Sequence, residues 1–171
     1  MQFGFNSDTK RGIRAEHGGV AVEFAIIFPI LVLLVFGIVD FGHAWYMRHV
    51  MSDASREGAR YGTRYQTAPG NTTQRLLPTA LSPSISDYIL KTAAQNGGSR
   101  GWGLKSLLPA DANPTASPTG AAATETSGTK LAGEDLTVTV HATKTWFVLG
   151  SIMPGFGSST NLTVSTTMKC E

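Results

Sequence analysis

The chain has 171 residues, a formal net charge of +2 and a single cysteine. This length allows one modest domain beside a membrane segment and is too short for two. The near-neutral charge gives no electrostatic footprint of nucleic-acid binding, and one cysteine excludes an internal disulfide and a multi-cysteine metal site.

Residues 1–18 are polar and weakly basic, without an amphipathic period. They predict a disordered cytoplasmic leader. A basic cluster before the apolar sequence favours a cytoplasmic N-terminus, but arginines also follow that sequence. Charge alone therefore leaves the topology open.

A continuous apolar run from Val20 to Val39 organises the chain, and Glu23 is its only charged residue. Twenty helical residues cover about 30 Å, the thickness of the hydrocarbon core of a bilayer. The run therefore predicts one membrane-spanning helix. A cleaved secretory signal is the alternative, but the run is long for a signal, and bulky Phe41 and Trp45 crowd the cleavage site that residues 42–44 would offer.

Glu23 is unusual because an acidic side chain costs up to about 2.5–3.5 kcal/mol at the centre of a membrane helix and less near its end. In one interpretation its carboxylate reaches the headgroups from the first turn. In the other, a peptidase cuts between Gly18, which presents no side chain, and Gly19. Glu23 would then be the fifth residue of the new chain, one turn from a free α-amino group. A cut after Gly19 is the competing register.

The sequence around this site resembles a known family. GVAVEFAIIFP after Gly18 is similar to the prepilin-type cleavage site of tight adherence (Tad, Flp) pilus components. The longer string VEFAIIFPILVLLVFGIVDFG, followed by ASREGARYG, is similar to the TadE-like minor pilins and pseudopilins. The resemblance covers about residues 16–66, in which the glutamate-aromatic pair, Pro29, Asp40 and the Ala-x-x-x-Gly-Ala-Arg segment come in the order of that family.

The resemblance implies that an aspartic prepilin peptidase at the cytoplasmic face of the bacterial inner membrane removes residues 1–18. It places the residues after Asp40 in the periplasm or outside the cell. Gly18 and Gly19 would form the cleavage site, and Glu23 and Phe24 would serve processing and assembly.

The resemblance also implies a minor pilin or pseudopilin that acts in pilus biogenesis and adhesion. Its expected partners are the inner membrane, the prepilin peptidase and other pilus components, with no nucleic acid and no small-molecule substrate. The alternative is an unprocessed, single-pass membrane anchor that carries an extracytoplasmic binding domain.

Residues 19–66 predict the membrane helix and its extracytoplasmic extension, because no helix breaker follows the apolar run. Ala54, Gly58 and Gly62 recur every four residues as a stripe of small residues. Since glycine costs up to about 1 kcal/mol in a helix interior, we expect close packing there, against the chain's own domain or another subunit. A parallel row of arginines favours a solvated or phospholipid-facing surface over contacts with a partner: Arg56, Arg60 and Arg64.

Residues 67–171 predict a small extracytoplasmic domain, which makes the fold class α+β. Apolar residues from Ile85 onward repeat at helical spacing after Ser82-Pro83 and predict a short helix. Residues 109–129 contain three prolines and no large apolar side chain, so they predict an exposed, flexible loop.

Two later segments alternate apolar and polar residues, residues 136–143 and 162–169, and predict half-buried strands of a small antiparallel sheet. The apolar connection between them, residues 146–156, predicts either a third strand with a buried turn or an exposed patch that touches membrane or a partner. Burial is slightly favoured.

We expect no enzymatic activity and no catalytic, cofactor or metal site. The four histidines show no metal-ligand spacing, and neither a nucleophile elbow nor a phosphate loop occurs. An extracytoplasmic enzyme would need polar residues that converge in the β region, and the sequence does not identify such residues.

Overall fold

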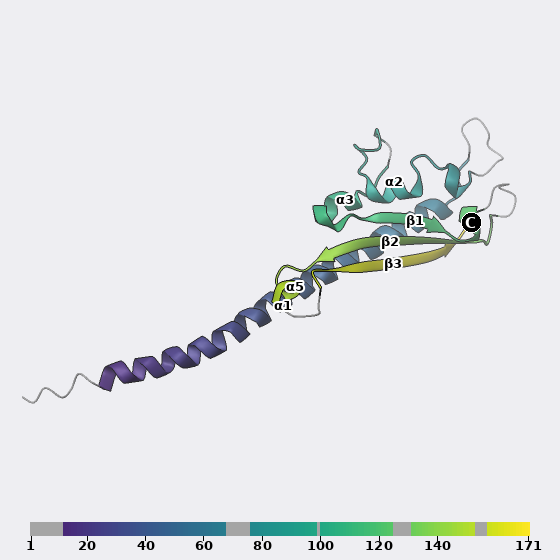
Figure 1. The fold of residues 1–171 in the computed structure, drawn as a ribbon. Coiled ribbons are helices and arrows are strands. Elements are labelled where there is room, and N and C mark those ends of the chain that lie inside the picture. Colours follow the sequence, from purple (N-terminus) through teal and green to yellow (C-terminus); the bar gives the residue numbers. More distant parts are fainter. Residues whose placement is uncertain (1–11, 68–75, 99, 125–130, 153–156) are drawn as a thin grey trace, which may run out of the picture.

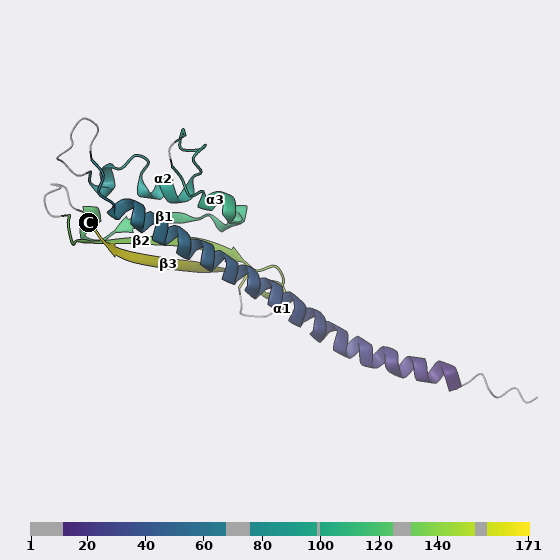
Figure 2. The ribbon, with the colours of Figure 1, turned by 180° about the vertical axis from the view of Figure 1, so that it is seen from behind.

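The computed structural model describes residues 12–67, 76–98, 100–124, 131–152 and 157–171. One long helix, α1 (Gly12–Thr63), joins a small domain of short helices and a three-stranded antiparallel sheet (Figure 1). The C-terminal half of α1 lies along the sheet, and its N-terminal half projects away from the domain, as the opposite view also shows (Figure 2). The predicted α+β fold, with a long N-terminal apolar helix, is confirmed.

Helix α1 begins at Gly12, so the prediction of a disordered leader is wrong for residues 12–18. Arginine, alanine and glutamate in this stretch are good helix formers. Extending an existing helix also avoids the unfavourable nucleation step, so these residues can continue the membrane helix toward the N-terminus. The remainder of the predicted leader, residues 1–11, lies outside the described residues.

The predicted short helix is α2 (Ile85–Leu90), but it starts later than the sequence suggested. Its cap is Ser84, whose Oγ accepts a hydrogen bond from the Asp87 backbone N–H at 3.1 Å. The helix ends at Leu90 because Lys91 adopts an extended backbone. Further short helices are α3 (Leu104–Leu107), α4 (Ala121–Thr124) and α5 (Leu149–Ile152), with 3-10 turns at Pro78–Ala80 and Ala110–Ala112.

The sheet has the order β1-β2-β3, and both pairs of neighbours are antiparallel. The two predicted strands are β2 (Asp135–Thr145) and β3 (Ser159–Lys169), which pair along their whole length. Alternation along β2 turns four apolar side chains into the core: Leu136, Val138, Val140 and Ala142.

The first strand, β1 (Thr115–Thr119), lies where the sequence predicted a flexible loop at 109–129, so that prediction is wrong for this segment. Pairing with β2 satisfies the backbone groups along one side of β1, although only Ala116 contributes a buried side chain. Pro118 is tolerated because β1 is an edge strand, where the missing N–H does not break a ladder. Helix α4 occupies a further part of the same stretch, and residues 125–129 lie outside the described residues.

The connection from β2 to β3 contains helix α5 and no third strand within its described part, residues 146–152. Leu149 is buried, whereas Phe147 and Ile152 are exposed. The expectation of a third strand is therefore wrong for this part. The burial and the exposure that the sequence left open both occur, since one apolar side chain enters the core and others face outward. Residues 153–156 of the connection are not among the described residues.

Candidate functional site

The environment of α1 changes at Asp40. The large apolar side chains from Val20 to Val39, except half-buried Val32, are exposed, between 39% at Leu33 and 67% at Val20. This part of the helix is long and apolar enough to cross a bilayer, and the most apolar stretch buries nothing against the domain. The exposed half of α1 therefore fits a single-pass membrane anchor.

Asp40 is the first fully buried residue after this exposed stretch. Its carboxylate accepts backbone N–H groups of the β2 to β3 connection: Phe147 at 2.9 Å on Oδ1, and Val148 and Leu149 at 3.1 and 3.2 Å on Oδ2. These bonds offset the cost of removing the carboxylate from water. Asp40 thereby holds the membrane-side end of the sheet domain onto α1.

Lys144 is the cation of this cluster. Its Nζ lies 3.4 Å from Asp40 Oδ1, and its side chain is 1% exposed. Nζ also donates to the Thr145 carbonyl oxygen and lies over the rings of Phe147 and Trp146, 4.4 and 5.1 Å from their centroids. Because both charges are buried, removing either one leaves the other without its counter-charge.

His43 lines the same junction one turn further along α1. Its Nδ1 is buried and has no hydrogen-bond partner among the described residues. The imidazole borders a cavity of about 40 Å³ that Lys144 and Asp111 also line. Burial lowers the pKa of His43, and the positive charge of Lys144 lowers it further, against the opposing charges of Asp40 and Asp111. The described ranges contain no group of three metal-ligating side chains here or elsewhere.

The predicted small-residue stripe faces the chain's own domain. A Cβ on Gly58 would lie 2.7 Å from Ile89 Cγ1, and one on Gly62 would lie 2.5 Å from Leu136 Cδ2. Ala54 is fully buried on the same face. Of the two partners that the sequence left open, the structure therefore places α2 and β2 of the same chain against the stripe.

The three arginines of the neighbouring row, Arg56, Arg60 and Arg64, are exposed. Arg60 Nε lies 3.4 Å from Glu57 Oε2 in a solvent-exposed ion pair. Arg64 borders an open depression of about 470 Å³ together with Tyr61 and Arg100. This row points away from the sheet core, and the structure does not bring it to the Asp40 cluster.

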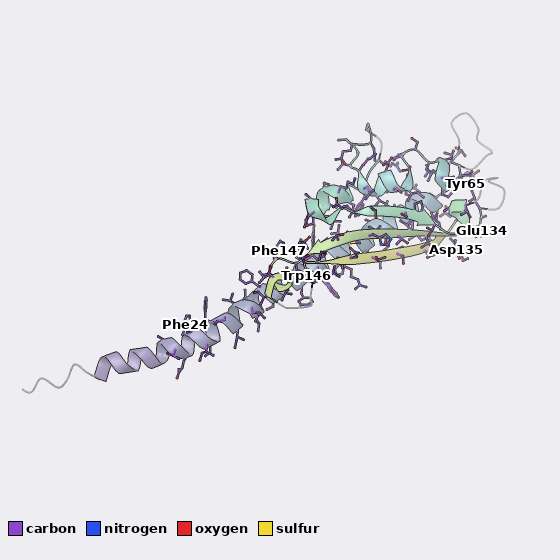
Figure 3. All side chains as sticks on the ribbon, in the orientation of Figure 1. Phe24, Tyr65, Glu134, Asp135, Trp146 and Phe147 are labelled. Carbon is purple, nitrogen blue, oxygen red and sulfur yellow. The ribbon has the colours of Figure 1, made fainter. Side chains whose placement is uncertain are left out.

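The residues predicted for cleavage and assembly lie on the exposed half of α1, far from the sheet domain; Phe24 is labelled in Figure 3. A Cβ at Gly18 or Gly19 would meet nothing within 4 Å. The Phe24 ring contacts that of Phe28, with centroids 5.3 Å apart. Glu23 is exposed and forms neither a hydrogen bond nor an ion pair with another described residue. Phe24 and Asp40 lie sixteen positions apart on the helix, about 24 Å along its axis.

Residues 18–60 match the family model of TadE-like protein. The TadE-like match begins at Gly18 and covers the exposed span, Asp40 and most of the small-residue stripe, but not the sheet domain. It agrees with the resemblance seen in the sequence and indicates a protein associated with a Tad pilus. Neither the curated proteins nor the solved structures contain a significant match.

Sequence reasoning noted Asp40 only as the acidic residue that closes the span, and it missed Lys144. A signal for Lys144 was present, because it continues the inward-facing positions of β2 after Leu136, Val138, Val140 and Ala142. A lysine at an inward position of a strand needs a buried counter-charge. Asp40 supplies it from a position 104 residues earlier in the chain.

Proposed function

We propose that the protein is a minor pilin or pseudopilin of a Tad/Flp-type pilus, with a structural and non-enzymatic role in pilus biogenesis and adhesion. The observation that carries this proposal is the TadE-like match, which begins at the glycine proposed for cleavage and continues through the apolar half of α1. That half has no packing partner within the described part of the chain, as a subunit that moves from a bilayer into a helical assembly requires.

In this proposal the N-terminus lies in the cytoplasm, α1 crosses the inner membrane, and the sheet domain is extracytoplasmic. A prepilin peptidase removes residues 1–18 at the cytoplasmic face. Because α1 is helical from Gly12, the peptidase has to open the first turns to reach the bond after Gly18. Two consecutive glycines reduce the cost of that opening, because glycine is a poor helix former.

Cleavage would create a new α-amino group one turn before Glu23. The carboxylate of Glu23 is exposed on an otherwise apolar surface, where an acidic group requires a partner. The new α-amino group, from the same chain or from a neighbouring copy, is a cation that can lie close enough to pair with this carboxylate. We propose that this ion pair sets the position of the subunit during assembly, with Phe24 packing beside it.

The processing step is tested by expressing the full chain with and without a prepilin peptidase and determining the N-terminus of the membrane-bound product by mass spectrometry. We expect a new terminus at Gly19 only with the peptidase, and its loss in Gly18→Leu. Gly37→Leu is the matched control, because a Cβ at Gly37 also meets nothing within 4 Å, and it should be processed normally.

A product that begins at Val20 would instead place the cut after Gly19. An intact Met1 in both samples would contradict processing and leave an unprocessed membrane-anchored binding domain as the better account.

A further inference from the structure

Four exposed apolar side chains belong to the two segments that meet where α1 enters the sheet domain. Two come from the first turns of α1 beyond the span, and two come from the β2 to β3 connection. We call them the apolar collar: Phe41 at 58% exposure, Trp45 at 66%, Phe147 at 63% and Ile152 at 51%. No charged residue occurs in residues 145–152, so the connection presents an uncharged surface.

The collar is held at a fixed height along α1. The backbone amides of Phe147, Val148 and Leu149 are bonded to the buried carboxylate of Asp40. The Phe41 ring meets the Trp146 ring edge to face at a centroid distance of 5.8 Å, and the His43 and Phe147 rings lie 5.3 Å apart. In Figure 3, Trp146 and Phe147 lie beside α1 where the helix leaves the domain.

This height coincides with the edge of the membrane segment. The collar begins two residues after Val39 and is continuous with the exposed apolar surface of the span. Phe41 and Trp45 are four residues apart, about 6 Å along the helix axis. The interfacial layer on each side of a bilayer has a similar thickness of about 5–7 Å, and it is where tryptophan and other aromatic side chains concentrate.

We infer that the collar is a lipid-binding surface, through which the β2 to β3 connection inserts Phe147 and Ile152 into the interfacial region of the bilayer that α1 crosses. The sheet domain then rests on the membrane at this end and does not hang from a free helix. Continuity with the span favours lipid over a protein partner, because the same bilayer necessarily surrounds the neighbouring turn of α1. Asp135 lies at the end of the sheet opposite Phe147 and Trp146 (Figure 3), so in this arrangement it is the end farther from the bilayer.

The test uses the full chain reconstituted in phosphatidylethanolamine and phosphatidylglycerol vesicles. Spin labels are attached at Phe147→Cys, Ile152→Cys and, as a control in water, Asp135→Cys, whose side chain is 55% exposed in a surface ion pair. The unsubstituted chain, whose Cys170 is 4% exposed, gives the background labelling. Collision rates with oxygen, which concentrates in lipid, and with a water-soluble nickel chelate are then measured.

We expect the ratio of oxygen to chelate collisions at positions 147 and 152 to shift strongly toward oxygen relative to position 135. The same ratio at all three positions would show a water-facing collar and overturn the inference. Low collision rates with both reagents at 147 and 152 would show that protein, from a second copy or otherwise, covers the collar, and would overturn it as well. The vesicles contain no pilus components, so this result is independent of the proposed pilus function.

Discussion

The half of α1 before Asp40 and the half after it belong to one continuous helix, yet they differ in which side chains they carry and in how these are exposed. From Val20 to Val39 the side chains are apolar around the whole circumference except for Glu23, and nearly all of them are exposed. After Asp40, one face is buried and contains methionine, alanine, serine and glycine, while arginine occupies the outside. In the first half, specific contacts with other subunits therefore depend on a few residues, such as Glu23, that differ from the uniform apolar surface. In the second half, the contact with the sheet depends on the close fit of small side chains.

The comparison predicts that substitutions on the buried face of α1, from Asp40 onward, change the stability of the domain, whereas substitutions before Asp40 change assembly only. The largest effect is expected at Asp40 itself. Asp40→Ala leaves the Lys144 ammonium buried and three backbone amides without their acceptor, which should lower the free energy of unfolding by about 3–5 kcal/mol. Urea unfolding of the full chain in lipid nanodiscs, followed by near-ultraviolet circular dichroism, measures this change.

Asp53→Ala is the control for this variant, since Asp53 is an exposed aspartate of the same helix. It should change stability by less than about 0.5 kcal/mol. Equal losses in the two variants would contradict a special role of the Asp40 cluster. The double variant with Asp40→Leu and Lys144→Met should recover only part of the loss, because it removes both buried charges together but leaves the three backbone amides without their acceptor.

The next largest effect is expected at the glycines that face the sheet. Gly62→Leu forces a side chain between Leu136 and Ile85, and overpacking of this kind costs about 1–3 kcal/mol. Gly42→Leu is the matched control, because a Cβ there meets nothing within 4 Å. Thermal unfolding of both variants in the same nanodiscs provides the comparison. A loss at Gly42 that equals the loss at Gly62 would show that helix propensity, and not packing against the sheet, governs both positions.

A smaller effect is expected where α1 meets β3 through a hydroxyl pair. Ser55 Oγ lies 2.7 Å from Thr166 Oγ1 in the part-buried interface, so Thr166→Val should cost about 1 kcal/mol. The control is Thr167→Val, which removes an equally short Oγ–Oγ contact, 2.8 Å from Thr137, on the exposed face of the sheet. Water replaces that bond, so the control should lose less. The reverse order in urea midpoints would contradict the assigned burial of the two pairs.

The smallest effect on stability is expected at Glu23, where the functional effect should nevertheless be large. Glu23→Ala touches no side chain of the sheet domain, so its unfolding free energy should change by less than about 0.5 kcal/mol. In cells that carry the pilus system, the same variant should lose subunit incorporation and surface attachment, as electron microscopy and an adhesion assay would measure. Normal piliation in Glu23→Ala would contradict the proposed role of an ion pair between Glu23 and the new α-amino group.

Local patterns were sufficient for the elements that carry their own periodicity. The apolar run predicted α1, the alternation of leucine and valine with threonine predicted β2 and β3, and the spacing of Ile85, Tyr88 and Ile89 predicted α2. Strand β1 was missed because its residues contribute almost no apolar surface. Its conformation is decided by the free edge of β2, which is formed by residues about twenty positions later in the chain.

The candidate site was predictable only in its N-terminal part. Gly18, Gly19, Glu23 and Phe24 form a contiguous motif, so they can be found without a structure. The Asp40 cluster joins one carboxylate to a lysine and three backbone amides more than a hundred residues away. Backbone amides have no sequence signature, and only the inward position of Lys144 hinted that an acid must lie opposite.

The unbroken course of α1 has a mechanical consequence. Its 52 residues form a helix about 78 Å long. The Asp40 cluster and the stripe of small residues attach the C-terminal half of this helix to the sheet without an intervening linker. A torque or an axial force applied to the N-terminal end of α1 is therefore transmitted to the sheet, which rotates or moves along the helix axis as a rigid body. Pro29 lies N-terminal to the Asp40 cluster, so bending at that position would change the direction of the membrane-spanning part of α1 without loosening the attachment of the helix to the sheet.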